Sequence, residues 1–423
     1  MDIKINPGTF LTGFIDLPTS KSQTLRALYS AMLAKGTSLV KEALEAEDTE
    51  AMIGAMKSFG VKVYKTKAGI IIHSPGWKGL KAPVNCFVNA SGITLRFMSA
   101  FASLFKTKVT FTGSISLMKQ RSIKDLEVGL KRLGVKTESN GGLCPFSVQG
   151  PIKKRQSWVI GKDSQPVSAL LWALSLKEKK QKLFVMKPEE KPWVELTMSW
   201  LKTQNKAVKN QNFKAFSIQG NKKVHPFVYK APKDFSSAAF MIGAGLVAGI
   251  NITLTGMNFK DKQGDKALIY LLKKWGACLE ISGSNLIINA SKGLNTKDVD
   301  VKDIIDALPI LSVLCILSKN PVRIKGAGGA RGKESDRVKS MAYNLSSVGL
   351  KVDEQPDGLI VYPSAIKGGL CEGFDDHRIV MSCAILGLIS GDGITIKGAE
   401  AVNKTYPTFF SHLEALGAKM ETL

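Results

Sequence analysis

The stretch SKSQTLRALYSAMLA, residues 20–34, shows a pattern that recurs five more times along this chain of 423 residues. In each copy a small polar residue opens an apolar run, and the openings lie at Ser20, Ser91, Asp163, Asp234, Asp306 and Asp376. The steps between consecutive openings are 71, 72, 71, 72 and 70 residues. A fixed period indicates one supersecondary unit repeated along the chain. The sequence therefore predicts six copies of a unit of roughly 70 residues.

Each opening predicts the start of a buried helix, because Ser and Asp accept hydrogen bonds from first-turn N–H groups and the runs that follow are apolar on nearly every face. A second series of Leu- and Met-rich segments predicts amphipathic helices that end at a glycine cap, at Gly60, Gly134, Gly276, Gly349 and Gly417. The sixth member is expected near Gln204–Asn205. Short runs such as KVTFTG and GITIKG predict strands between these helices. The fold class is therefore α/β or α+β.

The six repeats divide most naturally into two groups of three. The segments Leu17–Pro18 and KAPK, residues 230–233, lie at the boundaries of these groups. A strand predicted at Ile3–Ile5 precedes the first boundary, so the N-terminal segment is expected to complete the C-terminal half. We therefore expect a discontinuous domain of residues 1–18 plus 231–423 and a continuous domain of residues 19–230, each with three repeats.

The formal net charge of +24 is compatible with a nucleic-acid partner or with anionic substrates. The lysine runs lack interleaved aromatic residues, and no nucleic-acid-binding motif is present. Solvated faces of a lysine-rich protein explain them more simply. We therefore expect small anionic substrates and no nucleic acid.

Cysteine and histidine positions bear on redox state and metal binding. The six cysteines form no CxxC pair, and the four histidines show no metal-ligand spacing. The apolar runs are too short to span a bilayer, and no signal peptide precedes MDIKINPGTF. We therefore expect a soluble cytoplasmic protein that requires no metal or organic cofactor and binds no membrane.

Basic residues recur close to the predicted helix starts. They occur in the motifs TSKSQTLR (Lys21, Arg26), SGITLR (Arg96), MKQRS (Lys119, Arg121), GGARGKESDR (Arg331, Lys333, Arg337), DDHR (Arg378) and VNKTYP (Lys404). Guanidinium groups suit carboxylate and phosphate, and helix N-termini add partial positive charge. Their recurrence on one period favours an anion site over scattered surface ion pairs.

These motifs resemble the EPSP synthase (3-phosphoshikimate 1-carboxyvinyltransferase) family from end to end. LPTSKSQTLRAL is similar to the family's LPGSKSxxNRAL, and SGITLRFMSA is similar to its NSGTTxRxxxA. SLMKQRSIKDLEVGLKRLGV, DSQPVSALL, DFSSAAF, KESDR, DDHR and VNKTYPTFF match further family segments in the same order. The resemblance implies a two-domain inside-out α/β barrel, with three βαβαββ repeats in each domain and helix N-termini that face an active site in the interdomain cleft.

The resemblance also implies an activity. Family members transfer the enolpyruvyl group of phosphoenolpyruvate to the 5-hydroxyl of shikimate 3-phosphate and release phosphate, on the route to chorismate and aromatic amino acids. The reaction is an addition followed by an elimination and uses no cofactor. For this chain it implies two small-molecule substrates and a monomer.

Family positions carried over to this sequence give three sets of candidate residues. For shikimate 3-phosphate they are Lys21, Ser22, Arg26, Asp163, Ser164, Gln165, Asp306 and Lys333. For phosphoenolpyruvate they are Lys21, Gly92, Arg121, Gln165, Arg337, Arg378 and Lys404. Asp306 is the candidate base near the acceptor hydroxyl, and Glu334 with Lys21 is the candidate acid near the methylene carbon. No metal ligand is implied.

The chain departs from the family pattern at Ala90, Ile93, Ser122, Asp163, Glu190, Trp193 and Gly329. Asp163 and Glu190 stand where serines are usual, and they put carboxylates near the expected phosphate. Ile93 replaces a threonine directly after Gly92, and its bulk predicts reduced sensitivity to the family's inhibitor glyphosate with phosphoenolpyruvate binding retained.

Three other functions are compatible with parts of the sequence. A UDP-N-acetylglucosamine enolpyruvyltransferase shares the fold and the donor, but it usually carries a reactive cysteine on the loop matching GSISLMKQR, where this chain has none. A basic nucleic-acid-binding repeat protein would explain the charge but not the ordered motifs. An inactive relative is supported only by Asp163 and Glu190. A phosphate-release assay separates these functions.

Overall fold

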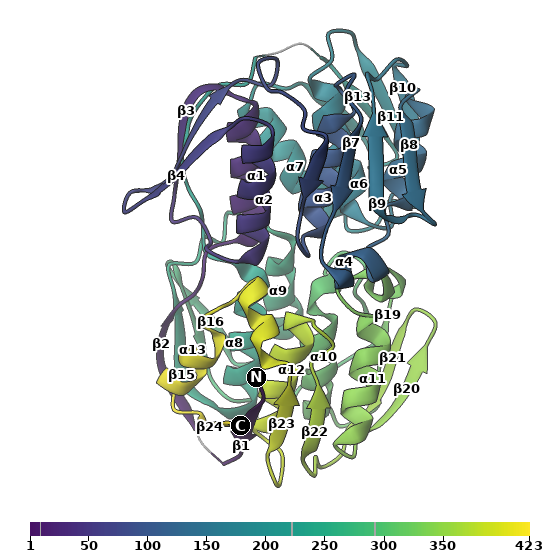
Figure 1. Cartoon of the computed structure of the whole chain (residues 1–423). Coiled ribbons are helices and arrows are strands. Elements are labelled where there is room, and N and C mark those ends of the chain that lie inside the picture. The colour runs from purple at the N-terminus through teal and green to yellow at the C-terminus, as the bar shows by residue number, and fades with distance from the viewer. Residues whose placement is uncertain (9, 221–222, 292) are drawn as a thin grey trace. The chain divides into compact units, whose positions relative to one another are not determined.

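The structure is a computed structural model that describes residues 1–8, 10–220, 223–291 and 293–423 (Figure 1). The chain divides into two compact units, a discontinuous unit of Met1–Pro18 with Pro232–Leu423 and a continuous unit of Thr19–Ala231. Ala231 belongs to the continuous unit, where its N–H donates to the carbonyl of Lys41. Within the described residues, each unit contains three four-stranded sheets.

The sheets of the continuous unit share one plan, a parallel strand pair followed by an antiparallel hairpin. Their strand orders are β14(Val228–Lys230)-β3(Lys35–Lys41)-β5(Gly69–Pro75)-β4(Lys62–Thr66), β6(Asn85–Phe87)-β7(Val109–Thr112)-β9(Leu143–Gln149)-β8(Lys136–Asn140) and β10(Gln156–Ile160)-β11(Gln181–Met186)-β13(Ala215–Ile218)-β12(Val208–Gln211). The first sheet takes its outer strand β14 from the end of the unit.

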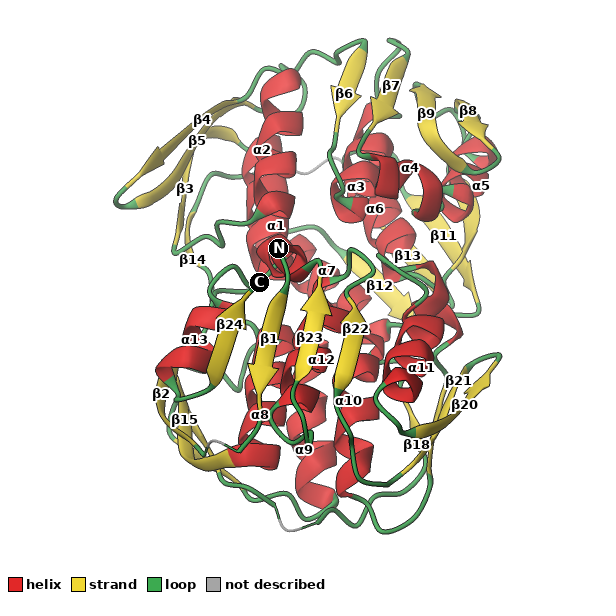
Figure 2. Ribbon diagram, turned by 60° about the horizontal axis from the view of Figure 1, so that its bottom comes forward, coloured by secondary structure: helices red, strands yellow, loops and turns green. Residues whose placement is uncertain are grey.

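The discontinuous unit repeats this plan. Its sheets are β16(Leu279–Ser282)-β17(Asn285–Ile288)-β15(Gly249–Thr255)-β2(Leu11–Asp16), β18(Val299–Asp300)-β19(Val322–Lys325)-β21(Gly358–Tyr362)-β20(Lys351–Gln355) and β22(Gly369–Glu372)-β23(Ile394–Lys397)-β1(Ile3–Asn6)-β24(Lys419–Thr422). Strand β1 lies antiparallel between β23 and β24, with Ile3 opposite both Ile396 and Thr422. The N-terminal strand thus completes the C-terminal sheet, and Figure 2 shows it in front of the helices.

Each unit also contains helices that pack against its sheets. In the continuous unit the helices are α1(Lys21–Leu33), α2(Glu47–Ser58), α3(Gly92–Ala102), α4(Ile115–Gln120), α5(Lys124–Arg132), α6(Ser164–Ser175) and α7(Lys191–Thr203). In the discontinuous unit they are α8(Phe235–Ala248), α9(Ala267–Lys274), α10(Leu308–Leu314), α11(Arg337–Ser347), α12(His377–Gly387) and α13(Phe409–Ala415). Every residue of α3 is buried, as expected for a helix that is apolar on all faces. The α/β prediction is confirmed.

The predicted helix starts are confirmed except at Asp306. Ser20, Ser91, Asp163, Asp234 and Asp376 each accept a hydrogen bond from a backbone N–H of the first turn that follows. Asp306 instead lies inside a short 3₁₀ turn, Ile305–Ala307, before α10. It caps no helix there, because its carboxylate binds two arginine side chains and Pro309 supplies no N–H in the first turn of α10.

The second helix series ends as predicted. The glycines after α2, α5, α9, α11 and α13 all have positive φ, between 78° and 108°. The sixth position, expected near Gln204–Asn205, is Asn205 with φ 55° directly after α7. Asn tolerates the left-handed conformation that a helix C-cap requires, so it replaces glycine here. No described helix is long and apolar enough to cross a membrane.

Candidate functional site

The first candidate residues lie at the start of α1 in the continuous unit. Lys21 is the first residue of the helix, and its Nζ lies 3.0 Å from Oδ2 of Asp48, near the start of α2. Ser22 follows, and its carbonyl oxygen accepts a hydrogen bond from Arg26 Nη1 at 3.0 Å. Asp48 was not singled out from the sequence, because an acid in the first turn of an amphipathic helix is common.

Arg26 is a buried cation, only 2% exposed, on the first turns of α1. Its Nε donates to Thr197 Oγ1 at 2.9 Å and its Nη2 to the carbonyl of Trp193 at 3.3 Å, both on α7. All its hydrogen-bond acceptors in the described part of the chain are neutral oxygens. Burial lowers the pKa of Arg26 to about 9, which leaves it charged at neutral pH. A buried cation of this kind favours an incoming anion.

Gly92 begins α3 and lies against two arginines. A Cβ at this position would lie 2.5 Å from Arg121 Nη2 and 2.7 Å from Arg96 Nη1, so a larger residue would have to displace these two guanidinium groups. Arg121 is 4% exposed. Arg96 Nη1 donates to Gln165 Oε1 and to the carbonyl of Gly92, each at 3.0 Å. The fold therefore joins Gly92 and Gln165, two candidates for the donor, through Arg96, and places a third candidate, Arg121, beside Gly92.

Arg96 had been noted among the basic motifs but had no assigned role. Its Nη2 donates to the carbonyl of Ser122 at 2.7 Å and lies 3.4 Å from Asp163 Oδ2. It thereby links the starts of α3 and α6 to the loop after α4. The sequence signal for this role was the spacing of Arg96, four residues after Gly92, since residues four apart lie on the same face of a helix.

The start of α6 is filled by two carboxylates. Asp163 Oδ1 accepts from the N–H of Gln165 at 2.9 Å. Glu190 Oε2 accepts from both the N–H and the Oγ of Ser164, at 3.1 and 2.7 Å. Asp163 and Glu190 are the two departures that the sequence placed near an expected phosphate.

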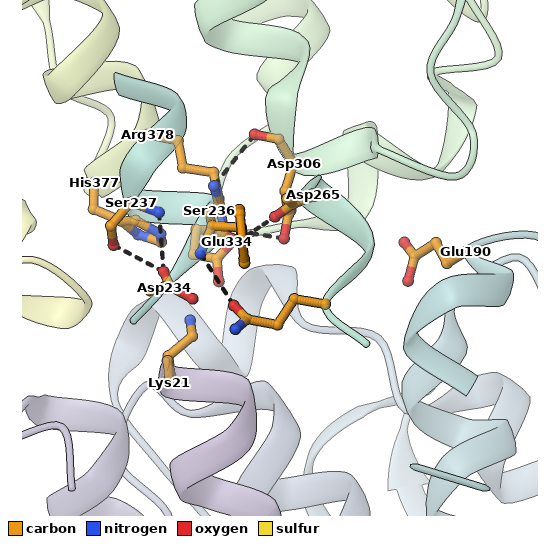
Figure 3. Close-up of polar contacts among 12 residues, drawn as sticks. Lys21, Glu190, Asp234, Ser236, Ser237, Asp265, Asp306, Glu334, His377 and Arg378 are labelled. Carbon is orange, nitrogen blue, oxygen red and sulfur yellow. Dashed lines mark hydrogen bonds and ion pairs between the residues drawn. The ribbon is translucent and has the colours of Figure 1, made fainter. Parts of the chain in front are cut away.

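The discontinuous unit gathers its candidates around Asp306 (Figure 3). Arg337 Nη1 lies 2.7 Å from Asp306 Oδ1, and Arg378 Nη2 lies 3.0 Å from its Oδ2. Burial alone would raise the pKa of Asp306, but the charges of Arg378, Arg337 and Lys333 hold this pKa well below its usual range. Asp306 is therefore a carboxylate at neutral pH, as an acceptor for a hydroxyl proton must be.

Arg337, at the start of α11, is bound by other carboxylates as well. Its Nε lies 2.7 Å from Asp376 Oδ2, and its Nη2 lies 2.6 Å from Glu334 Oε2. These carboxylates, with Asp306, raise the pKa of Arg337 despite its complete burial. Glu334 is thus held within the same ion-pair cluster as Asp306.

Lys333 follows a short 3₁₀ helix of the same unit, Gly328–Gly332, and Lys404 ends another, Ala399–Lys404. Lys333 is 8% exposed, and its charge acts on Asp306. Lys404 Nζ donates to the carbonyl of Asp375 at 2.6 Å, one residue before the α12 cap Asp376. The structure therefore groups Asp306, Glu334, Arg337 and Arg378 by direct contacts, and the charge of Lys333 acts on this group, whereas the contacts of Lys404 are with Asp375.

Asp265 is a charged residue of this region that sequence reasoning missed. It is 2% exposed and accepts a hydrogen bond from Ser236 Oγ on α8, while its Oδ1 has no hydrogen-bond partner in the described chain (Figure 3). Burial and the charge of Asp306 raise the pKa of Asp265 to about 7, against the opposing effect of Arg378. A single acid after glycine, as in QGD at 263–265, gave no sign of this burial.

Comparison with known proteins identifies relatives of this arrangement. The family model for EPSP synthase (3-phosphoshikimate 1-carboxyvinyltransferase) matches residues 5–413. A 3-phosphoshikimate 1-carboxyvinyltransferase of Chlamydia caviae is 37% identical over 99% of this chain and 94% of its own length. A solved EPSP synthase of Acinetobacter baumannii has a TM-score of 0.80 at 29% identity, with 99% of each chain covered.

A more distantly related solved structure is similar to this chain in its fold only. The enolpyruvyl transferase NikO from Streptomyces tendae is 15% identical, with a TM-score of 0.78 over 99% of this chain and 98% of its own. The fold is therefore that of two-unit α/β enolpyruvyl transferases.

Proposed function

This chain belongs to the EPSP synthase family, and on that premise we propose that it transfers the enolpyruvyl group of phosphoenolpyruvate to the 5-hydroxyl of shikimate 3-phosphate. In the addition the hydroxyl oxygen bonds to C2 of phosphoenolpyruvate, the hydroxyl loses its proton and the C3 methylene gains one. In the elimination the bond from C2 to the phosphate oxygen breaks, phosphate leaves and C3 loses a proton. No electrons are exchanged with a cofactor.

The observation that carries this proposal is the ion-pair cluster of Asp306 with Arg337 and Arg378. It keeps a carboxylate charged among cations that can also receive anionic substrates. Asp306 would accept the proton of the acceptor hydroxyl. Glu334, bonded to Arg337, and Lys21 of the continuous unit would supply the proton for C3.

Both units would supply substrate-binding residues. Arg26, Ser22, Ser164, Gln165, Asp163 and Lys21 would hold shikimate 3-phosphate together with Asp306 and Lys333. Lys21, Gly92, Arg121, Gln165, Arg337, Arg378 and Lys404 would hold phosphoenolpyruvate. Bringing two phosphorylated carboxylates together requires dense positive charge, because their repulsion otherwise opposes the reaction. The buried guanidinium of Arg26, with neutral partners, supports the acceptor role in particular.

We further propose that the enzyme works as a cytoplasmic monomer without a metal. All six cysteines are free thiols, as suits a reducing compartment. Among the described residues no group of His, Cys, Asp or Glu could hold a metal ion. Activity is therefore expected to persist after exhaustive chelation, and an activity restored only by a divalent cation would contradict this.

A phosphate-release assay tests the function directly. Purified protein is given phosphoenolpyruvate with either shikimate 3-phosphate or UDP-N-acetylglucosamine, and phosphate and the enolpyruvyl product are measured. We expect both products only with shikimate 3-phosphate. Release with the nucleotide sugar would instead favour the sibling enzyme, and release with neither would favour an inactive relative.

A further inference from the structure

The N-terminus of α6 is already occupied by anions of the protein itself. Asp163 Oδ1 takes the N–H of Gln165 at 2.9 Å. Glu190 Oε2 takes the N–H of Ser164 at 3.1 Å and its hydroxyl at 2.7 Å. The donors that would bind a phosphate at this helix start are therefore engaged by carboxylates.

The corresponding helices of the same unit differ. Helices α1 and α3 are capped by the neutral hydroxyls of Ser20 and Ser91. A serine cap satisfies first-turn N–H groups without adding negative charge, so such a helix start still attracts an anion. Helix α6 alone of these three carries a second, distant carboxylate, from Glu190 at the start of α7.

Glu190 is buried at this position, and its backbone has an uncommon conformation. Its side chain is 2% exposed, and its backbone has φ 49°, a left-handed conformation that is uncommon for glutamate. Its side chain makes no hydrogen bond that caps its own helix α7, and it reaches across to α6 instead. The contact with Ser164 is thus a buried link between two helix starts.

A buried cation lies beside the same two helices. Arg26 donates to the carbonyl of Trp193, three residues after Glu190, and to Thr197 Oγ1. Thr197 Oγ1 in turn donates to Ser168 Oγ on α6, at 2.9 Å. A buried positive charge thus lies against α7 near its start and is connected to α6 through Thr197.

We propose that Glu190 is a specificity-determining residue, an internal anion that the phosphate of the acceptor must displace from Ser164. The proposal rests on the proposed function, since it takes Ser164 as a contact of shikimate 3-phosphate. A carboxylate and a phosphate cannot share one set of donors, because like charges this close repel strongly away from water. Glu190 therefore weakens binding of the phosphorylated acceptor relative to the same acceptor without phosphate.

The test measures binding of two ligands to four proteins by titration calorimetry. The ligands are shikimate 3-phosphate and shikimate, and the proteins are wild type, Glu190→Gln, Glu190→Ser and the control Glu195→Gln, an exposed residue of α7. We expect both Glu190 variants to bind shikimate 3-phosphate ~10-fold or more tightly than wild type. Shikimate binding should change less than about twofold, and the control should match wild type for both ligands.

Unchanged or weaker binding of shikimate 3-phosphate in Glu190→Gln overturns the proposal. This variant keeps the shape of Glu190, so it remains decisive if Glu190→Ser folds poorly; melting temperatures establish that both are folded. The phosphate-release assay on wild type distinguishes failure of this inference from failure of the proposed function. If wild type turns over shikimate 3-phosphate while Glu190→Gln binds it no better, this inference fails and the proposed function stands. If no variant binds or turns it over, both fail.

Discussion

Arg26 in the continuous unit and Arg337 in the discontinuous unit are both buried arginines on the first turns of helices, yet their surroundings are opposite. Arg26 meets the neutral oxygens of Ser22, Trp193 and Thr197. Arg337 meets the carboxylates of Asp306, Glu334 and Asp376. The pKa falls for Arg26 and rises for Arg337 accordingly.

The difference indicates a division of labour. A cation with neutral partners gains by binding a substrate anion, because nothing charged must leave first. A cation already paired with carboxylates offers an incoming anion less, but it keeps those carboxylates ionised and in place for proton transfer. On this basis the continuous unit is expected to govern acceptor affinity and the discontinuous unit turnover.

The largest effect is expected for Asp306→Ala. Loss of the base should lower kcat by ~10²–10⁴-fold, with a much smaller change in KM for phosphoenolpyruvate. Steady-state phosphate release measures both, and Asp353→Ala, which loses only a hydrogen bond from Tyr362, is the control. Near-normal turnover with a lower melting temperature would show that Asp306 is merely structural.

The arginine comparison itself is tested by Arg337→Met and Arg26→Met. Arg337→Met leaves the buried carboxylate of Asp376 without its arginine and should lower the free energy of unfolding by about 3–5 kcal/mol. Arg26→Met removes a buried charge that no carboxylate pairs, so stability should stay within about 1 kcal/mol of wild type while acceptor binding is lost. Urea unfolding measures the first quantity and calorimetry the second. Equal destabilisation by both substitutions would remove the distinction.

Asp265→Asn tests the raised pKa of Asp265, in the discontinuous unit, through the pH dependence of the free energy of unfolding. The pKa of Asp265 is raised to about 7 in the folded protein, from an ordinary value of 3.8, so the folded state holds a proton that the unfolded state has lost in this window. Stability from this group therefore falls as pH rises between about 4 and 7, by up to about 4 kcal/mol.

The variant cannot titrate at this position, so its stability relative to wild type should rise across that window and stay level above it. Urea unfolding at several pH values measures the difference. Taking the difference cancels the contribution of other groups, such as His412, whose pKa is lowered by burial. A difference independent of pH would mean that Asp265 is ionised in the folded protein.

The smallest effect is expected at Ile93, directly after Gly92 in the continuous unit. Its side chain is 9% exposed and belongs to the core of that unit. If its bulk presses Gly92 toward Arg96 and Arg121, Ile93→Thr should lower the inhibition constant of glyphosate a few-fold and leave KM for phosphoenolpyruvate unchanged. Ile53→Thr, at another buried isoleucine of the same core, is the control. An unchanged inhibition constant would mean that Ile93 only fills the core.

Period and capping residues determined the repeats from sequence alone. Capping side chains such as those of Ser20 and Ser91 accept hydrogen bonds from backbone N–H groups two or three residues away. Because this range is so short, the local sequence is enough to predict the contact. The same reasoning found the exception in the glycine series, where Asn205 ends α7 in a left-handed conformation. Motif order then led to the family that the comparisons show.

Which groups the acidic side chains contact was decided only by the tertiary structure. Asp306 looked like another helix cap, yet it binds Arg337 and Arg378, which lie 31 and 72 residues further along the chain. Glu190 stood out as a departure, but only packing of α7 against α6 puts its carboxylate on Ser164. Asp265 gave no signal, because burial and the nearby charge of Asp306 create its raised pKa. Charges interact through space and respond to burial, so the local sequence does not contain their pairing.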